Sequence, residues 1–312
     1  MEKLLQWAVI NSKTEKDAPQ SENPASTQDL DPAVIDAILG KPVSEQMLEI
    51  MDYLENPDSP LEGKINELDN LEMLVEQIDD AANIEPLKMW PRILNLLSSE
   101  HDEIKINTLW VIATALQHNP AAQKAFCSHN GLEKILGCMN SSNNDGVKAK
   151  AIYAISALIR GNLEGFSQFV KYDGISILLQ NISNQALSKR VVFLLLSLVS
   201  EANDETATAE FRPPPSFPIA LLEAGVVQKV AENIECNISQ GESSIELVEN
   251  TLLLILNLSK SCKKASYSPP PFSKTSPELS SKLIKSFPNL QKEIPDTVIT
   301  KEDWECITSM VN

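Results

Sequence analysis

The sequence predicts an all-α protein whose short helical units stack into a solenoid, and three observations lead to this fold class. Apolar residues recur at helical spacing over nearly all of the chain between its polar and proline-rich breaks. No segment of useful length alternates apolar and polar residues as a half-buried strand does. One helical pattern also recurs four times, in residues 107–117, 150–160, 190–200 and 250–260.

A second, shorter helical module precedes each of these apolar helices. It contains a glycine in three copies (Gly131, Gly174 and Gly225) and lacks it in the first, at residues 88–94. We expect these glycines at a tight corner that needs left-handed or closely approached backbone. A period of about 40 to 47 residues is typical of armadillo and HEAT repeats. Each unit is too apolar to stand alone, so neighbours must stack. We therefore expect a right-handed armadillo-like solenoid of about four repeats with flanking capping helices; the alternative is a helical bundle with accidental similarity.

Polar and proline-rich segments divide the chain into four parts. Residues 11–31 contain almost nothing to bury, so we expect residues 1–31 to form a short apolar segment followed by a disordered acidic linker. Residues 32–86 should form N-terminal capping helices. Residues 87–262 should form the repeats, interrupted by a proline-rich loop at 202–217, and residues 263–312 a second proline-rich loop and C-terminal capping helices.

The chain is strongly acidic, with a formal charge of −17. Residues 1–104 hold 23 of its 43 acidic residues and only seven basic ones. Nucleic-acid-binding proteins normally carry a basic face, and anionic membranes attract basic segments, so we expect neither nucleic acid nor membrane as a partner. The remaining residues are nearly neutral, with 20 acidic and 19 basic side chains, and can still present local basic patches.

The motifs of catalytic and cofactor-binding sites are missing from the sequence. The five cysteines form no CxxC pair, and the three histidines lie at no metal-ligand spacing. No glycine-rich phosphate loop and no nucleophile motif occurs. We therefore expect no enzyme activity, no metal and no cofactor. The number of cysteines is odd, and the apolar N-terminal segment is not followed by a signal-peptide cleavage site. Both observations favour a reducing compartment, the cytoplasm.

One face of the long helices is the candidate binding surface. The third helix of each armadillo repeat lines the concave side, and removing its core positions leaves a ladder of residues three or four apart. Exposed aromatic side chains beside Lys, Arg and Asn supply the anchors and donors of a protein-binding surface. The alternative is that the aromatic residues are half-buried packing residues. The ladder comprises Asn107, Trp110, Thr114 and Gln117, then Lys150, Tyr153, Ala157 and Arg160, then Arg190, Phe193, Ser197 and Ser200, then Asn250, Leu253, Asn257 and Lys260.

Several stretches of the chain resemble one family. The opening MEKLLQWA and the block DNLEMLVEQIDDAANI at residues 69–84 resemble the fungal Fes-type exchange factors. Residues 150–160 with 169–174 are similar to that family and to its animal counterpart, the heat-shock-protein-70-binding protein. The similarity covers residues 1–10 and 33–310. It implies a nucleotide exchange factor for heat shock protein 70 that grips one lobe of the chaperone's ATPase domain with its concave armadillo face and itself binds no nucleotide.

The resemblance also implies which residues contact the chaperone. These are Ala81 and Asn83 in the acidic block, then Lys150, Tyr153 and Arg160, then Lys189 and Arg190. With the ladder residues they form the predicted partner-binding site, the partner being the ATPase domain and the factor a monomer. The ladder contributes Trp110, Thr114, Phe193, Asn250 and Asn257.

Two alternatives stay open at this point. An armadillo scaffold can instead bind an extended peptide, as nuclear import adaptors do with repeated Trp–Asn pairs. Here Trp110 is the only Trp on the ladder and Asn257 the only Asn at the inner position, which weighs against that function. The apolar segment at residues 4–10 is either a client-like segment that helps to free bound client or an amphipathic helix packed on the first repeat.

Overall fold

The computed structural model describes residues 41–240, 245–269, 276–295 and 298–311. The chain divides into two units, Met1–Pro42 and Val43–Asn312, and every helix described below belongs to the second. The predictions for residues 1–31, including the linker and the apolar segment, lie outside the described residues.

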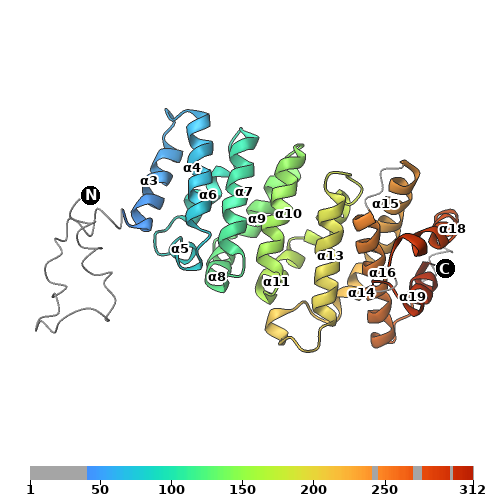
Figure 1. The fold of residues 1–312 in the computed structure, drawn as a ribbon. Coiled ribbons are helices and arrows are strands. Elements are labelled where there is room, and N and C mark those ends of the chain that lie inside the picture. Colours follow the sequence, from blue (N-terminus) through green and yellow to red (C-terminus); the bar gives the residue numbers. More distant parts are fainter. Residues whose placement is uncertain (1–40, 241–244, 270–275, 296–297, 312) are drawn as a thin grey trace, which may run out of the picture. The chain divides into compact units, whose positions relative to one another are not determined.

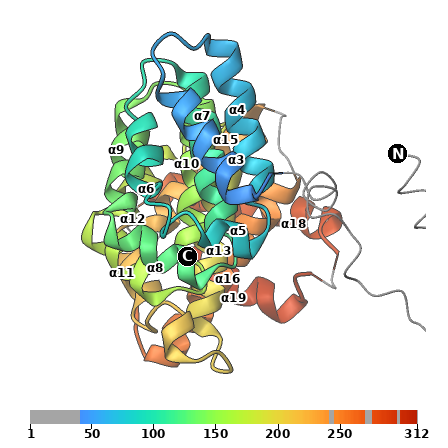
Figure 2. The same cartoon turned by 90° about the vertical axis from the view of Figure 1, so that its left-hand side faces the viewer.

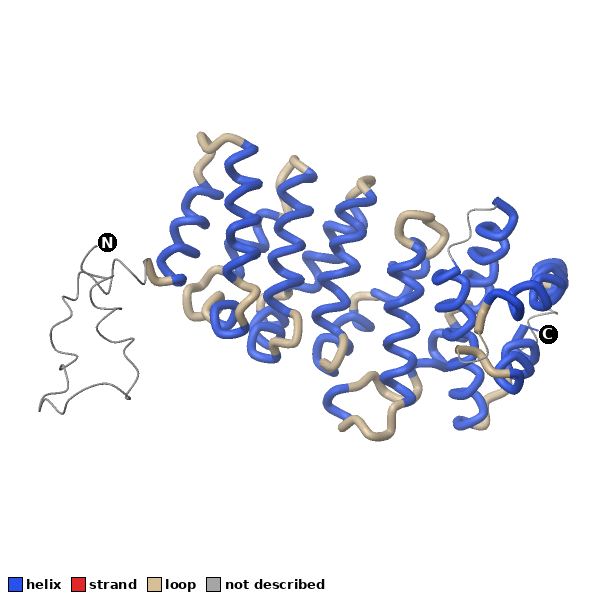
Figure 3. The backbone as a smooth tube through the Cα atoms, viewed as in Figure 1, coloured by secondary structure: helices blue, strands red, loops and turns tan. Residues whose placement is uncertain are grey.

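The described residues of the second unit form helices and loops without any strand (Figures 1 and 3). The helices α3 (Val43–Glu55), α4 (Leu61–Leu74) and α5 (Ile78–Ala82) come first. They are followed by α6 (Trp90–Leu96) and α7 (Asp102–Leu116) and then by three helical triplets. The triplets are α8 (Pro120–Ser128), α9 (Gly131–Ser141) and α10 (Asp145–Ile159); α11 (Leu163–Lys171), α12 (Gly174–Asn181) and α13 (Ser188–Asn203); and α14 (Phe217–Glu223), α15 (Val226–Gln240) and α16 (Ile245–Ala265). The helices α18 (Pro277–Glu293) and α19 (Lys301–Val311) come last.

The long helices α4, α7, α10, α13 and α16 lie side by side in sequence order, each packed against the next (Figure 1). The shorter helices α6, α9 and α12 lie together on one side of this row, where each packs against the long helix of its own repeat (Figure 2). The four recurring sequence patterns therefore correspond to α7, α10, α13 and α16, and the predicted all-α repeat organisation is confirmed.

A continuous apolar core runs between the two layers of helices. In α10 the four positions expected in the core, Ile152, Ile155, Leu158 and Ile159, are at most 2% exposed. Burying each such side chain contributes about 1.5–3 kcal/mol, which fixes the face that the helix turns inward. The opposite face of α10 is left for solvent, and this face carries the predicted ladder.

The corner before α9 shows which of the two expected roles its glycine has. The left-handed residue there is Asn130, with φ of 53°, rather than the glycine that follows it. Gly131 is required for close approach instead: an added Cβ would lie 2.3 Å from the ring of Phe126. Gly225, before α15, is itself left-handed, with φ of 77°.

The corner before α12 repeats the geometry of the corner before α9. Asp173 adopts the left-handed conformation, with φ of 57°. A Cβ on Gly174 would lie 2.2 Å from the ring of Phe169. Both glycines therefore let a phenylalanine from the preceding helix pack directly on the backbone, and a left-handed Asn or Asp makes the turn.

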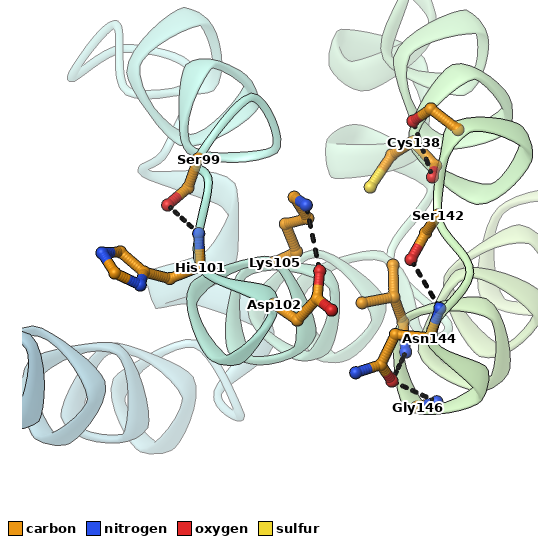
Figure 4. Close-up of polar contacts among 10 residues, drawn as sticks. Ser99, His101, Asp102, Lys105, Cys138, Ser142, Asn144 and Gly146 are labelled. Carbon is orange, nitrogen blue, oxygen red and sulfur yellow. Dashed lines mark hydrogen bonds and ion pairs between the residues drawn. The ribbon is translucent and has the colours of Figure 1, made fainter.

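Polar contacts lie at the starts of α7 and α10 (Figure 4). The Asn144 side chain caps α10 by accepting a hydrogen bond from the backbone N–H of Gly146 at 2.8 Å, and Ser142 Oγ accepts one from the Asn144 N–H at 3.1 Å. In the first turn of α7, Asp102 accepts from Lys105 Nζ at 3.0 Å, and this contact lowers the pKa of Asp102. The Asn144 cap fixes the start of α10 and so the register of the ladder residues that follow on it, whereas α7 has no side-chain cap.

The proline-rich segments lie between helices, as expected from their composition. The first runs from the end of α13 to the start of α14 and contains the short helix η2 (Ala209–Phe211). The second separates α16 from α18, and residues 270–275 within it lie outside the described residues. None of the helices in the described ranges has the length and apolar character needed to cross a bilayer.

Two cysteines, Cys127 and Cys138, are buried in the core. Cys127 and Cys138 are 3% and 7% exposed, and burial raises the pKa of the Cys127 thiol to about 11. The side chain of Cys236 lies outside the described residues. No group of His, Cys, Asp and Glu side chains in the described part of the chain is arranged to hold a metal ion.

Candidate functional site

The ladder faces of α7, α10 and α13 enclose a groove with a volume of about 730 Å³. We call it the central groove. Its lining residues are Ile106, Gln117, His118, Gly146, Ala149, Lys150, Ile152, Tyr153, Ser156, Ala157, Arg160, Gly161, Arg190, Phe193, Leu194 and Glu201. Twelve of the sixteen lie on α7, α10 and α13 and the other four just beyond the ends of α7 and α10, so packed helices form most of the groove.

Aromatic and basic side chains alternate along the central groove. Tyr153 and Phe193 are 38% and 50% exposed, so neither is an ordinary core residue. Lys150, Arg160 and Arg190 line the same groove. In a chain with a net charge of −17, this is a local basic patch around exposed aromatic anchors.

The Lys150 side chain is fixed on an aromatic face. Its Nζ atom lies 3.4 Å from the centroid of the Trp110 ring and 5.9 Å from that of Tyr153. Burial lowers the pKa of Lys150; the negative charge of Glu72 opposes this shift, and the positive charge of Arg190 adds to it. The groove therefore holds an ammonium group in a defined place, where a cation–π contact contributes about 0.5–2 kcal/mol.

Hydrogen bonds join the ladder of one repeat to the next. Tyr153 Oη donates to Gln117 Oε1 at 3.1 Å, between α10 and the end of α7. Arg160 Nε donates to Glu201 Oε1 at 2.9 Å, between the end of α10 and α13. The Arg160 charge is thereby neutralised within the groove. The positive charge offered to a partner comes from the other two basic side chains.

Five of the twelve predicted site residues meet in the central groove. They are Lys150, Tyr153, Arg160, Arg190 and Phe193. Trp110 adjoins the groove through its contact with the Lys150 ammonium and is 36% exposed. All three aromatic ladder residues are thus partly exposed, and their contact with a partner stays a prediction.

The surface position predicted for Ala81 is wrong. Its side chain is only 2% exposed and belongs to the core, because the short helix α5 turns this residue toward α7 and α8. Asn83, at the end of α5, is half-buried, and its carbonyl oxygen accepts a hydrogen bond from the Leu87 N–H at 3.1 Å. Neither residue lines the groove.

Four other predicted residues do not line the groove. The Thr114 hydroxyl donates to Glu72 Oε1 at 2.6 Å, so its proton already takes part in a hydrogen bond within the protein. Lys189 forms an ion pair with Glu246 of α16. Asn257 Nδ2 donates to a carbonyl oxygen of its own helix at 2.9 Å. Asn250 and Asn257 both lie on α16, one helix beyond the groove, and their contact with a partner stays a prediction.

The sequence reasoning missed two acidic residues, Glu72 and Glu201. Glu72 lies 42 residues before its partner Thr114, and Glu201 lies 41 residues after its partner Arg160. Both separations are close to one repeat period. Polar pairs at that spacing are the signal that would have found them.

Two family models match this chain. Residues 1–84 match the family described as nucleotide exchange factor Fes1, and residues 82–268, more than half of the chain, match the SIL1/FES1/HPBP1 C-terminal domain. The chain belongs to the Fes1 family. The boundary between the two matched regions falls at the end of α5, so the central groove lies wholly within the C-terminal region of the family.

Curated Fes1 relatives are similar over most of their length. The Hsp70 nucleotide exchange factor fes1 of Schizosaccharomyces pombe is 35% identical over 202 residues, covering 64% of this chain and 69% of the relative. Its namesake FES1 from Saccharomyces cerevisiae is 30% identical over 269 residues, covering 83% of this chain and 86% of the relative. The resemblance seen in the sequence is thus confirmed at the level of the family.

Solved structures with a similar fold are designed armadillo repeat proteins. One, named YIII(Dq)4CqI, has a TM-score of 0.60 and 15% identity and covers 85% of this chain and 99% of its own. Another, YIII(Dq.V1)4CPAF in complex with peptide (KR)4, has a TM-score of 0.59 and 14% identity and covers 85% and 98%. At these identities the likeness concerns the fold alone, and it confirms the armadillo-like prediction for this Fes1-family chain.

Proposed function

We propose that this Fes1-family chain is a nucleotide exchange factor for a heat shock protein 70 and that the central groove binds the chaperone's ATPase domain. The family description and the names of the relatives support the exchange function. The observation that supports the place of binding is the groove itself, where exposed Tyr153 and Phe193 lie beside Lys150 and Arg190. Aromatic anchors with charged neighbours are the typical centre of a protein interface.

Such a factor needs no catalytic group. If the groove binds the open form of the ATPase domain more tightly than the closed form, it must lower nucleotide affinity by the same factor, because the two binding equilibria are linked. ADP then leaves faster, ATP binds again and the client protein is released. The hydrogen bonds between successive repeats support this mechanism, since they hold α7, α10 and α13 in one arrangement against which the chaperone must adjust.

We also propose that the protein acts in the cytoplasm as a monomer. The free thiols of Cys127, Cys138, Cys262 and Cys306 are compatible with a reducing compartment. An import-adaptor function is disfavoured by charge: Lys150 and Arg190 in the groove would repel a peptide rich in Lys and Arg.

Two exposed phenylalanines allow a matched test of the binding surface. Phe193, in the groove, is 50% exposed, and Phe211, in the loop between α13 and α14, is 54% exposed. Phe193→Ala should weaken binding of an Hsp70 ATPase domain about tenfold or more in calorimetry, because it removes an anchor of the interface. Phe211→Ala should bind as the wild type does. Equal affinities for the two variants, or retention of a basic peptide in place of the ATPase domain, would overturn the proposed surface.

A further inference from the structure

A buried amide joins α7 to α10 next to the central groove. Gln123, on α8, is 6% exposed and is not among the residues that line the groove. Its Nε2 atom donates to the carbonyl oxygen of Leu116 at 3.1 Å and to that of Ala157 at 3.0 Å. Carbonyl oxygens can only accept, so both protons of the amide nitrogen are used. One side chain thus connects the end of α7 with the last turn of α10.

The two carbonyl groups need a partner from outside their helices. Leu116 is the last residue of α7, and Ala157 is the third residue from the end of α10. Carbonyl groups in the last turn of a helix have no partner within it, and a buried acceptor left without a hydrogen bond is costly. Because Gln123 bonds to both, the reach of a single amide group sets the separation between the two helix ends.

The same two helix ends are also joined inside the groove. Gln117 follows Leu116 directly, and its Oε1 atom accepts a hydrogen bond from Tyr153 Oη at 3.1 Å. Tyr153 precedes Ala157 by four residues, about one turn of α10. Gln123 and the Tyr153–Gln117 bond therefore hold the same turns of α7 and α10 together, the first from the protein interior and the second at the surface.

The repeat fold itself does not require an amide at this position. Phe166 lies 43 residues after Gln123, and the same separation relates the corner glycines Gly131 and Gly174. Phe166 is 3% exposed and packs edge-to-face on Phe217 with a centroid distance of 4.9 Å. An apolar side chain thus fills the corresponding place in the next repeat, which points to a task for Gln123 that is specific to the junction of α7 and α10.

We propose that Gln123 is a positioning residue for partner binding: its two hydrogen bonds fix the separation of α7 and α10 and so hold the Tyr153 ring where the partner meets it. This inference deepens the proposed function and rests on it for the identity of the partner. Gln123 is buried and acts only through Tyr153. A side chain that is already held in its binding position loses less conformational freedom when the partner binds.

The first experiment needs no chaperone. In full-length protein carrying fluorotyrosine, the four tyrosines are observed by ¹⁹F NMR, and Tyr153→Phe assigns the signal of Tyr153. Gln123→Met has a similar size and no donor, so it should shift and broaden that signal because the helix ends are no longer held together. Gln123→Glu keeps the shape of the side chain and removes at least one donor, so it should also shift the signal, and it serves if the Met variant does not fold.

Asn233 on α15 provides a matched control outside the groove. It is a buried amide, 5% exposed, and its Nδ2 atom donates to the carbonyl oxygen of Ile182 at 2.8 Å. Asn233→Leu also removes a buried hydrogen bond between repeats, but it should leave the Tyr153 signal unchanged. An unchanged signal in the Gln123 variants, or an equal change in Asn233→Leu, would overturn the proposal.

The second experiment measures binding of an Hsp70 ATPase domain by calorimetry. Gln123→Met should weaken binding about two- to tenfold, the size expected when one more interface side chain has to be ordered on binding, and Asn233→Leu should bind as the wild type does. In the Tyr153→Phe background the loss should be smaller, because the bond that Gln123 supports is already missing.

A loss of the same size in both backgrounds would show that Gln123 only supports packing, and the proposal would be wrong. If wild-type protein fails to bind the ATPase domain, the proposed function fails, whereas the NMR comparison still decides whether Gln123 positions Tyr153.

Discussion

Replacing Gly131 by Ala should destabilise the protein, although the same change usually stabilises a helix. The added Cβ would lie 2.3 Å from Phe126 Cζ, and real Cβ atoms do not approach a carbon so closely. The Phe126 ring has no room to retreat, since it is fully buried and packs edge-to-face on Trp90 with a centroid distance of 5.0 Å. Either the ring or the start of α9 must shift.

The expected size follows from two opposing contributions. Overpacking a well-filled core costs about 1–3 kcal/mol. Replacing Gly by Ala in a helix gains about 0.5–1 kcal/mol through the unfolded chain. The net loss for Gly131→Ala is therefore up to about 2.5 kcal/mol, which for an array of this length lowers the Tm by a few degrees.

Gly137 provides the control within the same helix. It is exposed, and no atom lies within 4 Å of an added Cβ, so Gly137→Ala should stabilise the protein by about 0.5–1 kcal/mol. Urea unfolding followed by circular dichroism compares the two variants with the wild type. If Gly131→Ala were as stable as Gly137→Ala, the close approach of Phe126 would not be the reason for the glycine.

Three further predictions concern the surface and the core. Lys150→Ala should weaken binding of an Hsp70 ATPase domain about tenfold and lower stability by about 0.5–2 kcal/mol, the contribution of its cation–π contact with Trp110; a loss of helix content would contradict its surface role. Cys127, whose thiol pKa burial raises to about 11, should react with a maleimide far more slowly than half-buried Cys306 in a mass-spectrometric time course, and equal rates would refute this. Arg92→Ala should cost about 0.5 kcal/mol near neutral pH, after allowing for solvent screening, because Arg92 bonds Glu55 at 2.6 Å and lowers its pKa. That cost should disappear in urea unfolding as the pH falls through the folded-state pKa of Glu55, where the carboxylate becomes protonated, and a cost that persists in acid would argue against the ion pair.

The repeat helices and their exposed faces could be predicted because both follow from spacing along one helix. The apolar positions of α10 fix its buried side, and Lys150, Tyr153 and Arg160 then fall on the other side whatever the neighbouring helices do. The same reasoning failed for Ala81. Its helix has five residues, too few for a period to define a face, so packing against α7 and α8 decides its burial.

Contacts between repeats could not be read from single helices. The bond from Thr114 to Glu72 depends on the stagger of α4 against α7, which the core side chains set together. At the corner before α9, the sequence left open whether the glycine is left-handed or allows a close approach; in the structure Asn130 is left-handed and Gly131 makes room for a ring. The preference of glycine and asparagine for turns located the corner, but it did not show which residue is left-handed and which makes room for the ring.

The rate at which labelled ADP leaves an Hsp70 tests the proposed function most directly. We predict that the full-length chain accelerates ADP dissociation in a saturable manner and hydrolyses no ATP itself. The acceleration should fall in Phe193→Ala and Lys150→Ala and stay at the wild-type level in Phe211→Ala. An ADP dissociation rate that the chain leaves unchanged, for every cytosolic Hsp70 tested and at saturating concentrations, would contradict the assignment of this protein as an exchange factor.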